Sequence, residues 1–459
     1  MHIPNRSKKS LRSLAGAAAA GLMALSLIAC SGGSSQASAG SATKGSITWW
    51  GWTPTNADEA KQFISAFNKQ YPDITVNFKL IGISDYQAAM RPALASDAGP
   101  DVYDLQPGAY VQQFGSYAED LTPVVSKALG SDWKTQIAKI AVDGMTSKGK
   151  LTALPIGSTY AGSLWYNYDL FKKYNLQPPT TLAQWKQVCA TFAKNGVGCF
   201  AQGASQEGFD QDTLQAIANS VQPGFWTQAS EGKAKWNSPV IVQTLSIWKQ
   251  LFDDGIMQKG ALGAQQYPDI NNAFLTGKYA MVMMGSWYTQ YATNTAMTQA
   301  ISAAGVAGAK PFPILPMQFP DVAGKGNTSE MFGDADYGLA VASKSKNRAA
   351  AETFATWMAT SKTGQQVVAN RLDTTPVLKG VAPDFSSIKF VDPTVQSGPV
   401  NAYLQRASTV GEPRFALLNA DIENAFLAAA QSVGSGSTSP QQAANTLQQA
   451  AQAAAAANG

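Results

Sequence analysis

The residues of this chain that could do chemistry are carboxylates and aromatic rings rather than histidines. The 459-residue sequence contains a single histidine, His2, at its extreme N-terminus. Histidine-based catalysis and histidine metal sites are therefore excluded from the rest of the chain. Carboxylate pairs exist, but Asp253-Asp254 ends a predicted helix, where acidic residues are usually solvated. No nucleophile elbow, phosphate loop or metal-ligand spacing is present, so we expect no catalytic residue, metal or cofactor.

Aromatic residues at the ends of predicted strands are better candidates for a binding site. The chain has 11 Trp and 15 Tyr residues. Residues 47–52 (Ile-Thr-Trp-Trp-Gly-Trp) predict a short buried strand that runs into a loop, and Trp52 lies two residues past Trp50, at the loop end of this stretch. A second buried strand, residues 279–284, leads into Gly-Ser and then Trp287. Because strand ends border the ligand crevice of α/β proteins, we expect Trp52 and Trp287 to face a ligand, and Trp49 and Trp50 to belong to the scaffold.

The N-terminal residues predict export and anchoring. Residues 1–29 combine a basic start with an apolar run, which is typical of a secretory signal peptide. The run ends in Leu-Ile-Ala before Cys30, which resembles the bacterial lipobox, in which the cysteine is diacylated. Residues 30–44 are rich in Ser, Gly and Ala and predict a flexible tether. We therefore expect a protein held at the outer face of the cell membrane by lipid on Cys30.

Two further observations concern the exported part. Cys189 and Cys199 form an even pair in an oxidising compartment, which favours a disulfide; two buried free thiols are the alternative. All four basic residues of the leader precede Cys30, and without them 30 basic residues face 30 acidic ones. A neutral exported chain argues against nucleic-acid binding, which needs a basic surface.

The periodicity of the first hundred exported residues predicts an α/β fold. Apolar residues at positions 60, 63, 64 and 67 share one helix face, and residues 74–78 alternate as a strand. Strands and helices alternate, which implies a parallel sheet with helices on both faces. The predicted elements are, in order, strand 47–52, helix 60–67, strand 74–78, helix 91–98 and strand 101–105.

From residue 46 onward the order of these pieces resembles the family 1 extracellular solute-binding proteins, the sugar-binding subunits of ABC importers. No single motif is specific for this family, but the order of the motifs behind a lipobox is specific for it. The resemblance rests on the strand with Trp49 and Trp50, Gly-Pro-Asp-Val at 99–102, Leu-Pro-Ile at 154–156 before Leu-Trp-Tyr-Asn-Tyr-Asp-Leu at 164–170, Phe-Leu-Thr-Gly-Lys-Tyr-Ala-Met at 274–281 before Gly-Ser-Trp at 285–287, and Gly-Leu-Ala-Val at 338–341.

The resemblance implies a periplasmic-binding-protein-like type II fold, in which two α/β lobes are joined by several chain crossings around a ligand cleft. The crossings are expected near residues 157–161, 286–288 and 338–341. The implied division is residues 45–157 plus 288–338 for lobe 1 and residues 158–287 plus 339–459 for lobe 2.

The resemblance also suggests ligand contacts, since a sugar site needs aromatic plates for ring faces and polar side chains for hydroxyls. Trp287 matches the family's Gly-Pro-Trp stacking position, with Ser in place of Pro, and Trp52 aligns with a polar contact position. Tyr160 lies where an acidic contact is expected, and Thr159 competes with it. The remaining candidates are Asp104, Gln106, Asp334, Asp336, Glu207, Trp226, Arg371 and Arg406.

The implied function is binding without catalysis. We expect a monomeric, lipid-anchored receptor that binds a mono- or oligosaccharide between its lobes and presents it to an ABC permease. Alternatives are the same fold with a polyamine, ferric ion or phosphodiester as ligand, or a secreted glycoside hydrolase.

Overall fold

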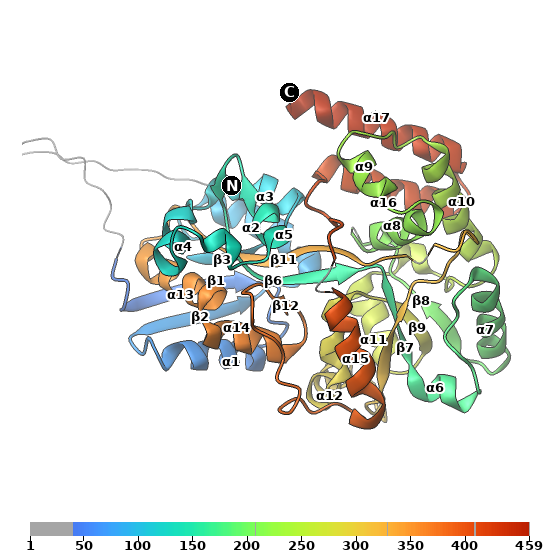
Figure 1. The fold of residues 1–459 in the computed structure, drawn as a ribbon, viewed down its shortest axis with the longest axis horizontal. Coiled ribbons are helices and arrows are strands. Elements are labelled where there is room, and N and C mark those ends of the chain that lie inside the picture. Colours follow the sequence, from blue (N-terminus) through green and yellow to red (C-terminus); the bar gives the residue numbers. More distant parts are fainter. Residues whose placement is uncertain (1–39, 207, 328, 408–409, 459) are drawn as a thin grey trace, which may run out of the picture. The chain divides into compact units, whose positions relative to one another are not determined.

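The computed structural model describes residues 40–206, 208–327, 329–407 and 410–458 (Figure 1). The expected signal peptide, Cys30 and Glu207 lie outside these residues. Two sheets organise the described chain, one of six strands and one of four, besides a two-stranded ribbon of β4 (Thr146–Ser147) and β5 (Lys150–Leu151). We call the parts built on the two large sheets the first and the second lobe.

The six-stranded sheet has the order β12-β6-β11-β3-β1-β2. The predicted parallel pairing holds for β1 with β2 and with β3, whereas β11 is antiparallel to β3 and to β6. The strands are β1 (Gly45–Gly51), β2 (Ile74–Leu80), β3 (Val102–Leu105), β6 (Leu154–Ala161), β11 (Phe332–Val341) and β12 (Thr375–Pro376). The first lobe's helices are α1 (Ala57–Asn68), α2 (Ile83–Ala95), α3 (Ala109–Phe114), α4 (Thr122–Leu129), α5 (Lys139–Gly144), α13 (Arg348–Thr360) and α14 (Lys362–Arg371), with 3₁₀ turns η1 (Gly115–Tyr117) and η2 (Trp133–Thr135).

The four-stranded sheet has the order β10-β7-β9-β8. Its strands are β7 (Ser163–Asn167), β8 (Gly198–Ala201), β9 (Tyr279–Met283) and β10 (Ile314–Gln318). Its helices are α6 (Tyr168–Lys173), α7 (Leu182–Lys194), α8 (Phe209–Val221), α9 (Phe225–Ser230), α10 (Pro239–Asp253), α11 (Asn271–Leu275), α12 (Asn294–Ala303), α15 (Pro393–Ala407), α16 (Ala420–Gly434) and α17 (Pro440–Asn458). Short turns η3 (Ala261–Gly263), η4 (Gln266–Ile270) and η5 (Ser286–Ala292) complete it.

Two long antiparallel strands, β6 and β11, connect the lobes (Figure 1). β6 carries the chain from the first lobe towards β7, and β11 returns it to the first lobe, where its last residues pair with β3. Three hydrophobic clusters follow this division: one joins Ile47 to Leu339, and the other two lie around the second sheet. The fold is thus the expected two-lobed α/β fold.

The segments of each lobe differ from those expected from the sequence. β10 lies inside the segment 288–338 assigned to lobe 1, yet it pairs with β7 of the second sheet. Tyr288 and Tyr291 likewise pack in a second-lobe cluster, so the chain does not cross at residues 286–288. Conversely α13 and α14, inside the segment 339–459 assigned to lobe 2, pack on the first sheet. Gly-Ser-Trp at residues 285–287 follows the end of the buried strand β9. A sequence pattern cannot distinguish such a strand end from a point where the chain crosses between the lobes.

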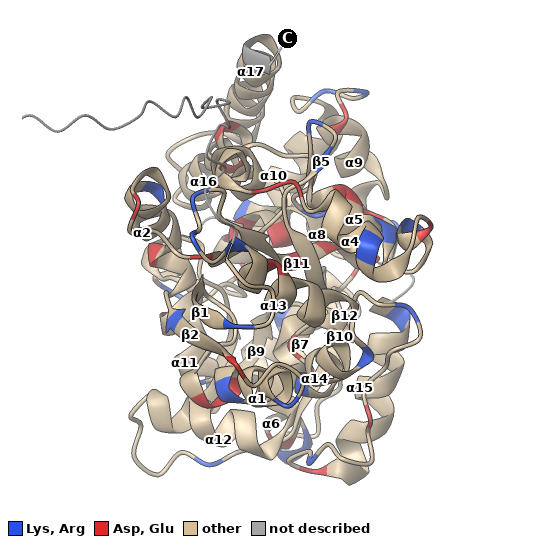
Figure 2. Ribbon diagram, turned by 90° about the vertical axis from the view of Figure 1, so that its left-hand side faces the viewer, with Lys and Arg blue, Asp and Glu red and all other residues tan. Residues whose placement is uncertain are grey.

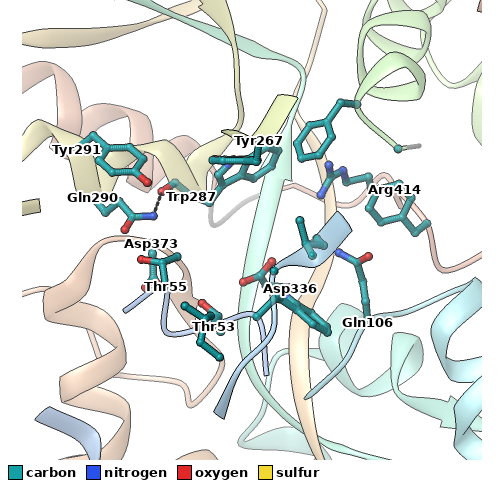
Figure 3. Close-up of a pocket in the computed structure, with 17 residues that line it drawn as sticks. Thr53, Thr55, Gln106, Tyr267, Trp287, Gln290, Tyr291, Asp336, Asp373 and Arg414 are labelled. Carbon is teal, nitrogen blue, oxygen red and sulfur yellow. Dashed lines mark hydrogen bonds between the residues drawn. The ribbon is translucent and has the colours of Figure 1, made fainter. Parts of the chain in front are cut away.

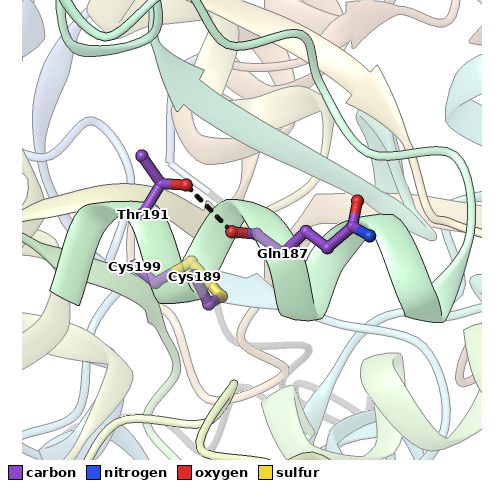
Figure 4. Close-up of a disulfide and its surroundings, with 4 residues drawn as sticks. All are labelled: Gln187, Cys189, Thr191 and Cys199. Atoms are coloured by element: carbon purple, nitrogen blue, oxygen red, sulfur yellow. Dashed lines mark hydrogen bonds between the residues drawn. A yellow bond between two sulfur atoms is a disulfide. The ribbon is translucent and has the colours of Figure 1, made fainter. Parts of the chain in front are cut away.

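The expected disulfide joins Cys189 of α7 to Cys199 of β8, with Cα atoms 4.9 Å apart (Figure 4). The bond links a helix to the neighbouring strand of the second sheet, where both residues belong to its core. The prediction of a disulfide is thereby confirmed.

Basic and acidic residues are interspersed along the elements visible in Figure 2. Over the described ranges, no helix combines the length and apolar character that a membrane span requires.

Candidate functional site

A cavity of 270 Å³ lies where the two lobes face each other (Figure 3). The first lobe contributes the loops after β1 and β2, and the second contributes the start of α8, η4 and η5. Its wall combines aromatic rings with hydroxyl, amide, carboxylate and guanidinium groups. The lining residues are Trp52, Thr53, Thr55, Leu80, Gly82, Ile83, Gln106, Gly208, Phe209, Tyr267, Trp287, Gln290, Tyr291, Asp336, Asp373, Arg414 and Phe415.

Trp52 forms part of the first-lobe wall and is half-buried. Its ring meets those of Tyr86 and Tyr110 edge-on, with centroids 4.8 and 5.8 Å away. Edge-to-face contacts of this kind fix the orientation of a ring. Trp49, by contrast, is fully buried, and Trp50 carries the Lys79 ammonium 3.8 Å from its ring centroid.

Asp104, expected to contact ligand, is instead fully buried behind the Trp52 loop and does not line the cavity. Its carboxylate accepts hydrogen bonds from Trp49 Nε1 (2.8 Å) and from the backbone N–H groups of Trp52 (3.0 Å) and Thr53 (3.3 Å). A Cβ at Gly51 would lie 2.2 Å from this carboxylate, so glycine permits the approach. Burial raises the pKa of Asp104 well above its usual value. The geometry gives Asp104 the task of shaping the loop that carries Trp52.

Trp287 lies on the second-lobe wall, at the beginning of η5. The Phe209 ring packs edge-on against it at 6.2 Å, and the Arg414 guanidinium lies 4.6 Å from its centroid. A cation over an indole face is an attractive contact. Gly285 makes room for the ring, since a Cβ there would lie 2.2 Å from Trp287.

Arg414 was not among the residues expected from the sequence. Its Nε and Nη2 donate to both carboxylate oxygens of Asp212 on α8, at 2.7 and 2.6 Å. The arginine belongs to residues 412–416, here called the strap, which lie between α15 and α16. Helix α8 holds the strap further, because the Gln211 and Gln215 side chains donate to its carbonyl groups. An irregular segment gives no periodic signal, which is why the sequence did not reveal it.

Asp334, also expected to contact ligand, holds the strap and does not line the cavity. One of its oxygens accepts from the backbone N–H groups of Arg414 (3.0 Å), Ala416 (2.9 Å) and Phe415. Burial raises its pKa to about 6, although these hydrogen bonds act in the opposite direction.

Asp336 does line the cavity, as Figure 3 shows. Residues two apart on a regular strand share a face, but the pairing of β11 with β6 is irregular between Ala335 and Tyr337. Such a bulge re-aims the side chain it carries. Asp336 accepts from Thr159 Oγ1 at 3.1 Å, and burial together with the charge of Asp373 raises its pKa to about 7.

Asp373 was also missed, and it reaches the cavity through a buried ion-pair cluster. Arg371 donates to Asp373 (2.7 Å) and to Glu59 of α1 (2.8 Å), and its side chain is 6% exposed. Burial acts to lower the pKa of Arg371, but the neighbouring Asp373 and Glu59 carboxylates outweigh it and raise this pKa above its usual value. Arg371 itself does not line this cavity; it fixes the carboxylate that does.

Of the other candidate residues, one lines the cavity and the others lie elsewhere. Gln106 lines the cavity. Tyr160 is 5% exposed, and its backbone N–H donates to Ser286 Oγ (2.9 Å) away from the cavity lining. Trp226 is core, stacked on Phe426 with centroids 4.7 Å apart, and Arg406 packs over Tyr403. In the described part of the chain, no cluster of three or more Cys, Asp or Glu residues could hold a metal ion.

The model of the bacterial extracellular solute-binding proteins matches residues 52–365, which include most of the cavity-lining residues. The chain belongs to this family. Family membership agrees with a ligand cleft between two lobes, and the cavity lined by residues of both lobes is the candidate binding site.

Relatives agree with this assignment. The arabinooligosaccharide-binding protein of Bacillus subtilis is 22% identical over 58% of the chain, which spans 61% of that protein's length. The galactooligosaccharide-binding protein of the same organism is 23% identical, over 80% of the chain and 81% of the relative. The GacH receptor of Streptomyces glaucescens, solved free and with acarbose, superposes with a TM-score of 0.68 at 20% identity, covering 89% of this chain and 98% of that one. At this identity the superposition shows the fold alone.

Proposed function

We propose that this protein binds a neutral mono- or oligosaccharide in the cavity between its lobes and delivers it to the permease of an ABC importer. The observation that carries the proposal is the pair of half-buried tryptophans, Trp52 and Trp287, contributed to one cavity by different lobes. Apolar C–H faces of a sugar ring pack on such indoles, and hydroxyl groups need polar partners around the rim. The named relatives that bind oligosaccharides support the same ligand class.

The charges at the cavity favour an uncharged sugar over an anionic ligand. Arg414 is already paired with Asp212, and Arg371 with Glu59 and Asp373. Asp336 faces the cavity with a hydroxyl, that of Thr159, as its hydrogen-bond partner. A phosphodiester or uronic acid would therefore meet carboxylates, while a neutral hydroxyl can donate to them.

Binding would favour the closed arrangement, because ligand contacts groups of both lobes at once. In this closure the first lobe would move as the six-stranded sheet with α1–α5, α13 and α14. The second lobe would move as the four-stranded sheet with α6–α12 and α15–α17. No bond of the ligand is broken in this scheme. The protein would act as a monomer at the outer membrane face, held by lipid on Cys30.

Isothermal titration calorimetry with neutral, amino and acidic glycans tests the ligand class. We expect heat from at least one neutral glycan, a smaller radius of gyration by X-ray scattering at saturation, and no release of reducing ends. Binding of only spermidine, ferric ion or a phosphodiester would overturn the sugar assignment, and release of reducing ends would indicate a hydrolase. Mass spectrometry of the membrane-extracted protein tests the anchor, which Cys30→Ser should abolish.

A further inference from the structure

The carboxylate of Asp336 faces the cavity without a basic partner (Figure 3). It accepts a hydrogen bond from Thr159 Oγ1 at 3.1 Å, and among the described residues no lysine or arginine forms an ion pair with it. Asp334, two residues earlier, instead accepts from three backbone N–H groups. Because a carboxylate can accept about four hydrogen bonds, Asp336 retains acceptor sites for a ligand.

The ion pairs beside the cavity leave an excess of acidic groups. Arg371 is shared by two carboxylates, those of Glu59 at 2.8 Å and of Asp373 at 2.7 Å. Arg414 is engaged by both carboxylate oxygens of Asp212. Three carboxylates therefore stand against two guanidinium groups, and the potential at the cavity favours a positive charge.

Asp336 adds a further carboxylate to this set. Burial and the charge of Asp373 raise its pKa to about 7, while the Thr159 hydrogen bond and Arg414 act in the opposite direction. A cation that entered the cavity would stabilise the ionised form. The titratable and charged groups that interact with Asp336 are Asp104, Tyr267, Tyr337, Asp373 and Arg414.

The aromatic rings of the cavity are a second, independent reason to expect a cation. Arg414 already lies 4.6 Å from the ring centroid of Trp287. Trp52, Tyr267 and Tyr291 also line the cavity, and no lysine or arginine of the described chain lies over any of their rings. Aromatic faces attract ammonium groups, so a cation here gains from the rings as well as from the carboxylates.

We infer that the cavity prefers a sugar in which a protonated amino group replaces one hydroxyl, with the ammonium placed at Asp336 and Asp373. This inference rests on the proposed function and narrows its ligand class: neutral sugars bind, and amino sugars bind more tightly. The ammonium donates charge-assisted hydrogen bonds, which are roughly twice as strong as those of a neutral hydroxyl. An N-acetylated amine carries no charge and lacks this advantage.

The test uses isothermal titration calorimetry at pH 7 with matched sugars. Glucose and galactose are each compared with derivatives that carry an amine, or its N-acetyl form, in place of one hydroxyl at successive ring positions, as mono- and disaccharides. The proteins are the unmodified chain, Asp336→Asn and Asp85→Asn. Asp85 is an exposed acid of α2 that does not line the cavity, although Gly82 and Ile83 beside it do. Its variant removes the same charge without removing a cavity group.

In the unmodified protein and in Asp85→Asn, we expect at least one amino sugar to bind about tenfold more tightly than its hydroxyl and N-acetyl counterparts, equivalent to 1.4 kcal/mol. In Asp336→Asn this preference should disappear, while the hydroxyl sugar still binds. Amino sugars that bind no more tightly than their counterparts, or a preference unchanged in Asp336→Asn, overturn the inference and leave the proposed function intact. Absence of binding by every sugar overturns both.

The pH dependence of the unmodified protein gives a second readout, which does not depend on the folding of a variant. As the pH falls below 7, Asp336 takes up a proton, whereas an amine with a pKa of about 8 stays protonated. The preference for an amino sugar over its N-acetyl counterpart should therefore decrease from pH 7 to pH 5. A preference that is constant over this range contradicts the role of Asp336.

Discussion

Trp52 and Trp287 face the same cavity, but their surroundings are built in different ways. Trp52 is fixed within one lobe, since Asp104 of β3 bonds the backbone of its loop and two first-lobe tyrosines pack against its ring. Trp287 instead packs against the guanidinium group of Arg414, which belongs to the strap. The strap is held by α8 of the second lobe, and Gln112 of the first lobe donates to the Leu418 carbonyl just beyond it.

The difference indicates which wall can respond to movement between the lobes. The Trp52 wall is a rigid part of a single lobe. The Trp287 wall depends on an irregular segment that touches both lobes, so its geometry is tied to how the lobes meet. Removing Asp212, which holds Arg414 beside Trp287, should therefore affect stability and ligand binding differently from removing Asp104, which holds the Trp52 loop.

Asp212→Ala should have the largest effect, because it leaves the buried Arg414 guanidinium without its carboxylate. Breaking one partner of a buried ion pair costs about 3–5 kcal/mol. Chemical denaturation should show a loss of this size, and calorimetry a marked loss of sugar affinity. Asp253→Ala, at the exposed ion pair with Lys249, is the matched control and should change stability by less than about 1 kcal/mol. A loss in Asp212→Ala no larger than in the control would contradict the role of the ion pair.

Asp104→Ala should have the next largest effect, with a loss of stability of about 3 kcal/mol. Three donors, two of them in buried hydrogen bonds and the third in a part-buried one, lose their acceptor at about 1–3 kcal/mol for each buried donor, while relief of the buried carboxylate offsets part of the sum. Asp104→Asn, which retains one acceptor oxygen, should lose less in the same denaturation experiment. Equal stability of Asp104→Ala and the unmodified protein would show that Asp104 does not support the Trp52 loop.

Removing either tryptophan should lower sugar affinity by about 10–100-fold, since burial of a large apolar side chain contributes about 1.5–3 kcal/mol. Double-mutant cycles measure whether each supporting residue acts through the tryptophan of its own wall. Trp287→Ala with Asp212→Ala should be non-additive in affinity, and so should Trp52→Ala with Asp104→Ala. Trp52→Ala with Asp212→Ala should be closer to additive. Additivity within each wall, measured by calorimetry, would mean that Asp212 and Asp104 do not act through the tryptophans.

The smallest effect on sugar affinity is expected from Asp336, which lines the cavity. Its pKa, raised to about 7 by burial and by Asp373, exceeds the unfolded value of about 3.9, so the native protein binds an extra proton between these pH values. The contribution of Asp336 to stability is therefore neutral below pH 4 and becomes unfavourable as the pH rises to about 7. Asp336→Asn should raise the melting temperature at pH 8 by several degrees and leave it unchanged at pH 4.

Sugar affinity should rise several-fold from pH 6 to pH 8 if ligand hydroxyls donate to the Asp336 carboxylate. Asp336→Asn should flatten this profile. A pH-independent affinity in the unmodified protein would remove Asp336 from ligand recognition.

The sequence was informative where a residue follows a regular element. Trp52 and Trp287 each follow a buried strand, and the structure places both on the cavity, together with Gln106 and Asp336. Their contact with ligand stays a prediction. Asp104 and Asp334 appeared equivalent to these residues in the sequence, but their carboxylates accept hydrogen bonds from backbone N–H groups, a distinction that only the tertiary fold creates.

Arg414 and Asp373 could not be predicted, because each reaches the cavity through a partner distant in sequence. Arg414 is positioned by Asp212, 202 residues earlier, and Arg371, which orients Asp373, pairs with Glu59, 312 residues away. The segments of each lobe were misassigned for a related reason, since β10 joins the second sheet by pairing with β7 far back in the chain.

The most direct test of the central claim is calorimetric titration of neutral oligosaccharides into the unmodified protein and into a variant carrying both Trp52→Ala and Trp287→Ala. We expect saturable binding of at least one oligosaccharide to the unmodified protein, and an affinity lower by a factor of about 100 or more in the folded double variant. Equal affinity of the two proteins for that sugar would contradict a site between these tryptophans.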